Sequence, residues 1–140
     1  MARLLNKSAV QPRSRFNLLT AYTIRRSPLR SHVASLRISI PTNSQPNRVE
    51  LVATVGVRGI TGIGQILFRV SRDGTEIFNT VAGIESTGSE QNYIVTFQAI
   101  DRNVPTGSHL YVLTAENLTP HTIVNVVGPV SFSALAVKTG

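Results

Sequence analysis

Cysteine and tryptophan are both absent from the 140-residue sequence. The lack of cysteine excludes disulfides, thiol catalysis and cysteine-based zinc sites. No apolar run reaches the roughly 18 residues that a membrane-spanning helix needs, so we expect no membrane partner. A chain of this length can bury a sizeable core in one domain without a disulfide or a metal.

Acidic residues are scarce and unevenly placed. The chain has 7 acids against 14 basic residues, and none of the acids lies in residues 1–49. That segment holds nine basic side chains: Arg3, Lys7, Arg13, Arg15, Arg25, Arg26, Arg30, Arg37 and Arg48. An asymmetry of this kind is typical of an interacting tail. We therefore predict a basic N-terminal arm over residues 1–32 and a β domain over residues 33–140.

The residues show no catalytic or metal-binding pattern. The three histidines, His32, His109 and His121, do not form a metal-ligand spacing. The sequence contains no Gly-x-Ser-x-Gly elbow and no phosphate-binding loop ending in Lys-Ser/Thr. The scarcity of aromatic side chains argues against a carbohydrate-binding platform. We expect neither an enzyme nor a bound cofactor.

The second half of the chain reads as short strands separated by turns. Residues 49–57 alternate apolar and other side chains, and Asp73-Gly74 between two apolar runs predicts a hairpin. Gly128-Pro129 is expected to separate two further strands. About eight strands are predicted in all, which favours an all-β jelly-roll sandwich. The predicted strands cover residues 33–40, 49–57, 65–71, 75–80, 93–100, 109–115, 122–127 and 130–138.

The arm contains one apolar segment, residues 15–24, that could itself be a strand. Its candidate anchors for a partner are Phe16, Leu18, Leu19, Tyr22 and Ile24. The basic residues expected to set its orientation are Arg13, Arg15, Arg25, Arg26 and Arg30. Because apolar residues are interleaved with the arginines, docking on a protein is favoured over coating of phosphates. A nucleic-acid arm, a solvated tail and an organelle transit peptide remain alternatives.

Three segments resemble Bacillus exosporium protein C and related spore-surface and endospore appendage proteins. They are residues 47–57, 66–80 and 126–136, within a resemblance that covers roughly residues 47–138. It implies a jelly roll like that of tumour necrosis factor and C1q, assembled as a homotrimer. It also implies a structural role in the exosporium or in an appendage fibre. In some relatives an N-terminal connector engages the preceding subunit.

The first hypothesis is therefore a structural subunit that self-assembles at the spore surface, with its arm on a neighbouring subunit. Other spore-surface proteins would anchor the assembly. The trimer contact is expected on apolar strand faces, with Phe97, Tyr111 or Phe132. The second hypothesis is a small viral capsid or nucleic-acid-coating jelly roll whose basic arm binds nucleic acid.

Overall fold

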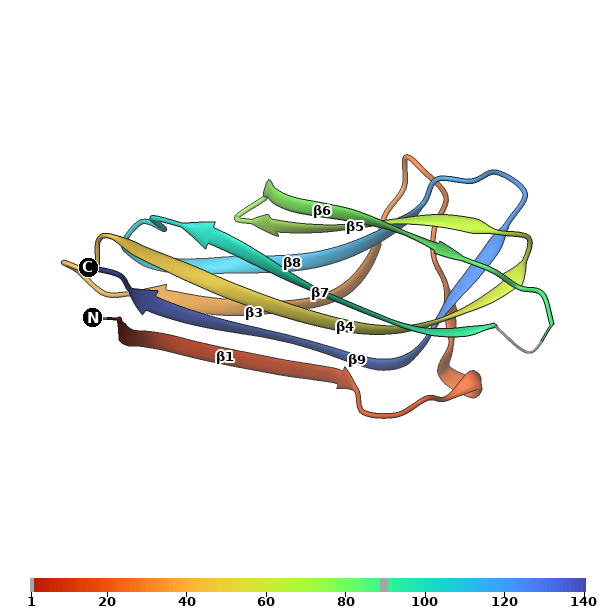
Figure 1. Cartoon of the computed structure of the whole chain (residues 1–140), viewed down its shortest axis with the longest axis horizontal. Coiled ribbons are helices and arrows are strands. Elements are labelled where there is room, and N and C mark those ends of the chain that lie inside the picture. Colours follow the sequence, from red (N-terminus) through yellow and green to blue (C-terminus); the bar gives the residue numbers. More distant parts are fainter. Residues whose placement is uncertain (1, 89–90) are drawn as a thin grey trace.

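The computed structural model describes residues 2–88 and 91–140, and its regular structure is almost entirely β (Figure 1). The first sheet, sheet A, has the strand order β1-β9-β4-β7, with the short β2 also on β9. Its strands are β1 (Arg3–Arg13), β2 (Tyr22–Thr23), β4 (Asn47–Thr61), β7 (Asn92–Arg102) and β9 (Ile123–Lys138).

The second sheet, sheet B, has the order β3-β8-β5-β6. Its strands are β3 (Ser31–Ile40), β8 (Gly107–Asn117), β5 (Gly64–Arg72) and β6 (Thr75–Ile84). All of these strand pairs are antiparallel. Two antiparallel sheets face each other, and this confirms the predicted jelly roll. Within the described residues, no helix has the length and apolar character to cross a membrane.

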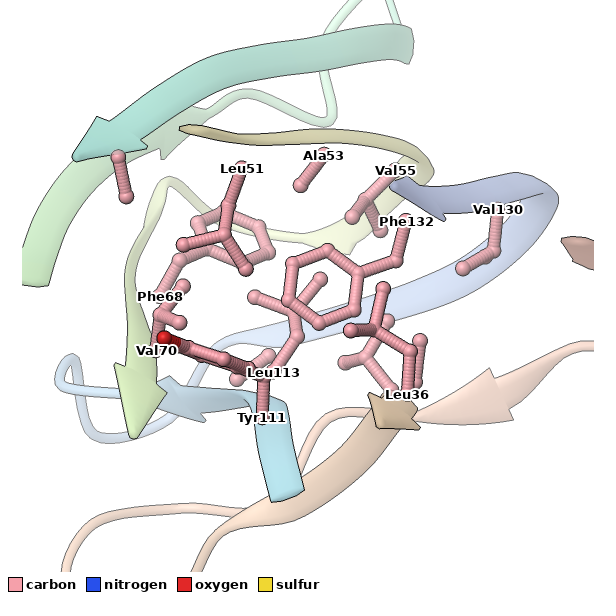
Figure 2. Close-up of a cluster of buried hydrophobic side chains, with 14 of the residues drawn as sticks. Leu36, Leu51, Ala53, Val55, Phe68, Val70, Tyr111, Leu113, Val130 and Phe132 are labelled. Carbon is pink, nitrogen blue, oxygen red and sulfur yellow. The ribbon is translucent and has the colours of Figure 1, made fainter. Parts of the chain in front are cut away.

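The core lies between the two sheets (Figure 2). On β4, the alternating residues Val49, Leu51, Ala53, Val55 and Val57 are all buried, as the period of two predicted. The opposing layer includes Phe68 and Leu113 of sheet B. The alternation therefore fixes which face of β4 points inward.

The aromatic residues expected at a trimer contact belong to this core instead. Tyr111 and Phe132 are buried, and Phe97 packs against the core in contact with the rings of Phe68 and Phe78. The expectation was wrong for these three residues because the strand faces that carry them cover the opposite sheet of the same chain. Side chains in that position cannot reach a second subunit.

The hairpin between β5 and β6 confirms the Asp-Gly prediction. Asp73 and Gly74 have φ angles of 50° and 87°. Positive φ at both central residues is what a type I′ turn requires. The Asp73 carboxylate also accepts hydrogen bonds from the Leu110 amide at 2.8 Å and from the His109 ring at 2.6 Å. These bonds tie the turn to β8.

Strand β9 corrects the predicted break at Gly128-Pro129. It runs without interruption from Ile123 to Lys138. The register against β4 shifts here, since Val130 pairs with Val55 but Val126 pairs with Val57. This bulge accommodates the proline, which has no N–H to offer the ladder.

Candidate assembly surface on the N-terminal arm

The N-terminal arm lies along its own domain rather than apart from it (Figure 1). Strand β1 pairs with β9 at the edge of sheet A. A single 3-10 turn at Leu18–Thr20 and the two-residue strand β2 follow. The chain then continues over residues 24–30 to β3, so the predicted boundary after residue 32 falls inside that strand. The predicted strand over residues 15–24 is reduced to β2.

Strand β1 has no fully buried residue. Its inward contacts with the core come from Leu5 and Val10, which are only partly buried. Between Leu4 and Asn6 its register against β9 shifts. One side-chain hydrogen bond, from Asn6 Nδ2 to the Ser39 carbonyl at 3.1 Å, links it to β3. Backbone pairing with β9 is thus the main interaction that holds β1.

Three of the five predicted apolar anchors project from the domain. Phe16 is 48% exposed, Leu18 is 53% exposed and Leu19 is 95% exposed. They surround the 3-10 turn, which Asn17 caps by accepting a hydrogen bond from the Leu19 amide at 2.9 Å. The Asn17 amide in turn donates to the Val127 carbonyl at 2.8 Å. The backbone of this apolar protrusion, residues 16–19, is therefore held while its side chains are open to solvent.

The other two predicted anchors attach the arm to its own domain. Ile24 is 1% exposed and belongs to the core, and its amide donates to the Val124 carbonyl at 2.9 Å. Tyr22 is half-buried beneath the Arg13 guanidinium, which lies 5.1 Å from the ring centre. Burial raises the pKa of the Tyr22 phenol, and the charge of Arg13 partly offsets this effect. In this conformation neither side chain is free for a neighbour.

The predicted basic residues also fall into two groups, those exposed to solvent and those that contact the domain. Arg15, Arg25 and Arg26 are exposed. Arg30 lies 3.7 Å from the Glu116 carboxylate, which also lies 3.3 Å from Arg69 of β5. The Glu116 side chain is only 4% exposed. A buried carboxylate between two guanidiniums therefore attaches residues 25–30 to sheet B, beside the Arg26–Asn117 bridge.

We expect replacement of Glu116 by glutamine to loosen this part of the arm. Loss of the charge leaves Arg30 without its acidic partner, and Arg69 keeps only its ion pair with Glu76. Limited trypsin digestion should then cleave after Arg25 and Arg26 several-fold faster than in the wild-type chain. Glu76→Gln is the matched control, because Glu76 also pairs with Arg69 but is exposed. Equal cleavage rates in the two variants would contradict this role for Glu116.

Comparison with known proteins defines the fold but no family. No protein-family model matches the chain, and no curated protein matches it. Among solved structures, the infectious bursal disease virus Gx strain superposes with a TM-score of 0.55, 9% identity, and coverage of 100% of this chain and 32% of that chain. The T=1 particles derived from the same virus superpose with a TM-score of 0.52 and 10% identity, and the match covers 98% of this chain and 36% of that chain.

A structure of dimeric latent PorU from Porphyromonas gingivalis gives a TM-score of 0.55 and 10% identity, with coverage of 96% of this chain and 13% of that chain. The chain thus spans between 13% and 36% of the length of these three structures. At these identities the likeness establishes a shared sandwich architecture, and function has to be argued from the residues of this chain.

Proposed function

We propose that the chain is a non-enzymatic structural protein that self-assembles into a spore-surface layer or appendage fibre. In this assembly the arm of one subunit docks on a neighbouring subunit. The resemblance of residues 47–138 to spore-surface proteins suggests the location. The proposal includes a trimer as the repeating unit and other spore-surface proteins as anchors, and it requires no cofactor.

The observation that carries the proposal is the apolar protrusion at residues 16–19. A leucine that is 95% exposed next to two half-exposed apolar side chains is unusual on a monomer and typical of a contact site. Arg13 and Arg15 lie beside it, so charge can orient the contact. A protrusion that enters a different surface of the next copy makes a heterologous contact, which builds rings or open filaments.

The double variant Phe16→Ala with Leu19→Ala tests the arm contact. Burial of each side chain should contribute roughly 1.5 kcal/mol or more, so their joint loss is about 3 kcal/mol. Such a loss raises the concentration needed for assembly about 100-fold. Negative-stain electron microscopy over a concentration series should show fibres or sheets of the variant only at concentrations about 100-fold above those at which the wild-type chain forms them. Thermal unfolding should be unchanged, because both side chains are exposed.

The matched control is Val81→Ala with Leu118→Ala, which removes two exposed apolar side chains elsewhere on the surface. It should assemble as the wild-type chain does. Point substitutions are preferable to truncation, since removing residues 1–31 would also delete the core residue Ile24. Assembly of the Phe16/Leu19 variant at the wild-type concentration would exclude these anchors.

The likeness to the two virus structures favours a second candidate, a capsid or nucleic-acid-coating subunit. Here the exposed Arg15, Arg25 and Arg26 would neutralise phosphates. This candidate predicts co-purified nucleic acid, a high ratio of absorbance at 260 to 280 nm, and assembly that weakens steeply with salt. The structural-fibre proposal predicts a low ratio and assembly that depends on Phe16 and Leu19.

A further inference from the structure

The solvent-facing side of sheet A carries few charges over its centre. Val52, Ile94, Ile100 and Leu135 point outward from β4, β7 and β9 and are 41%, 60%, 45% and 39% exposed. Their outward neighbours are mostly small or uncharged: Ala9, Thr54, Thr96, Gln98, Ser131 and Ser133. The outer face of an antiparallel sheet that meets water is normally polar. This face is therefore suited to a partner.

Two rows of side chains cross β1, β9 and β4 on this face. In the first row, Lys7 and Glu50 both pair with Leu135, so the three residues lie side by side. In the second row, Ala9 and Val52 flank Ser133 in the same way. A groove of about 570 Å³ follows these rows, with Lys7, Ala9, Glu50, Val52, Ser133 and Leu135 among its lining residues.

We propose that this face binds the same face of a second copy about a two-fold axis parallel to β9. Such an axis exchanges the β1 side of one copy with the β4 side of the other. Lys7 then faces Glu50 of the second copy, and Glu50 faces its Lys7. Leu135 meets Leu135 on the axis. In the next row the larger Val52 lies over the small Ala9, so the shape matches as well as the charge.

Self-complementarity of this kind is what an isologous contact requires. Among the described residues Lys7 has no acidic partner within its own chain, whereas Glu50 has only Arg48. The two faces would pack as aligned sheets do in a sandwich, about 10 Å apart. About this axis three strands of each copy overlap, and at about 4.8 Å per strand and seven residues at about 3.4 Å they bury roughly 700 Å² over two copies, the size of a weak, transient contact.

The contact is independent of the arm, and the experiment is designed in the Phe16→Ala, Leu19→Ala background to remove any assembly through the arm. Sedimentation equilibrium at about 0.15 M salt should show a concentration-dependent doubling of mass, from one chain to two, or from three chains to six if the proposed trimer forms without the arm. Lys7→Glu or Glu50→Lys each places two like-charge pairs in the contact, and each should raise the dimer dissociation constant at least about tenfold. The double variant Lys7→Glu, Glu50→Lys restores opposite charges and should restore the dimer.

Arg37→Glu, on the outer face of β3, makes the same change in net charge as Lys7→Glu and should leave the dimer intact. Circular dichroism and thermal unfolding confirm that each variant is folded. A mass that does not double at any concentration in the arm-blocked background would overturn the proposal. So would a double variant that dissociates as readily as the two single variants, because the pairing of Lys7 with Glu50 would then be absent.

Discussion

Replacing Gly56 with alanine should lower the free energy of unfolding by about 3 kcal/mol or more, at the upper end for overpacking a core. A Cβ atom at this position would lie 2.0 Å from the Gly128 carbonyl oxygen, 2.4 Å from its carbon and 2.9 Å from the Pro129 nitrogen. All three are backbone atoms of β9, so they cannot rotate away. The two strands have to separate at the bulge, which disrupts the centre of sheet A.

Urea denaturation followed by circular dichroism measures this effect. Gly83→Ala is the matched control, because Gly83 also lies in a strand and its nearest neighbour is the flexible end of Gln65, 3.3 Å away. We expect the control to change the free energy of unfolding by less than about 1 kcal/mol. Similar urea midpoints for the two variants would contradict the close approach of β4 and β9 at Gly56.

The same contact explains why β9 could not be predicted from its own residues. Taken alone, Gly128-Pro129 predicts the end of a strand, because proline lacks the N–H that the hydrogen-bond ladder uses. The strand continues because Gly56, distant in sequence, allows β9 to approach closely at a bulge. By contrast, the alternation of β4 and the turn at Asp73-Gly74 are local signals, and both were predicted correctly.

The arm shows the limit of sequence reasoning for the candidate site. Strand β1 was not predicted, since its bulge near Leu5 breaks the alternation that would identify it. Phe16 and Ile24 belong to the same class of residue, yet one is 48% exposed and the other 1% exposed. Backbone hydrogen bonds hold both segments to β9, but the Ile24 side chain enters the core between the sheets whereas that of Phe16 does not. The charge balance of the first 49 residues identified the segment, but only the fold shows which side chains face solvent.

Replacing Asp101 with alanine should have a comparably large effect, about 3 kcal/mol, because it disrupts a polar link between the sheets. One Asp101 carboxylate oxygen, from β7, accepts a hydrogen bond from the Tyr111 hydroxyl at 2.8 Å and from the Arg72 guanidinium at 2.7 Å. Burial, together with the bond to Asp101 and its negative charge, raises the pKa of the Tyr111 phenol well above its ordinary value. The hydroxyl therefore remains a donor at all ordinary pH values.

A double-mutant cycle tests whether this link acts as a unit. Tyr111→Phe alone should cost about 1–2 kcal/mol, since it removes one hydrogen bond to a charged group and keeps the ring in the core. In the Asp101→Ala background the same change should cost less than about 0.5 kcal/mol or even stabilise, because it removes a buried hydroxyl that has lost its acceptor. Denaturant midpoints for the four chains give the coupling energy. Strictly additive costs would mean that Tyr111 and Asp101 stabilise the two sheets separately.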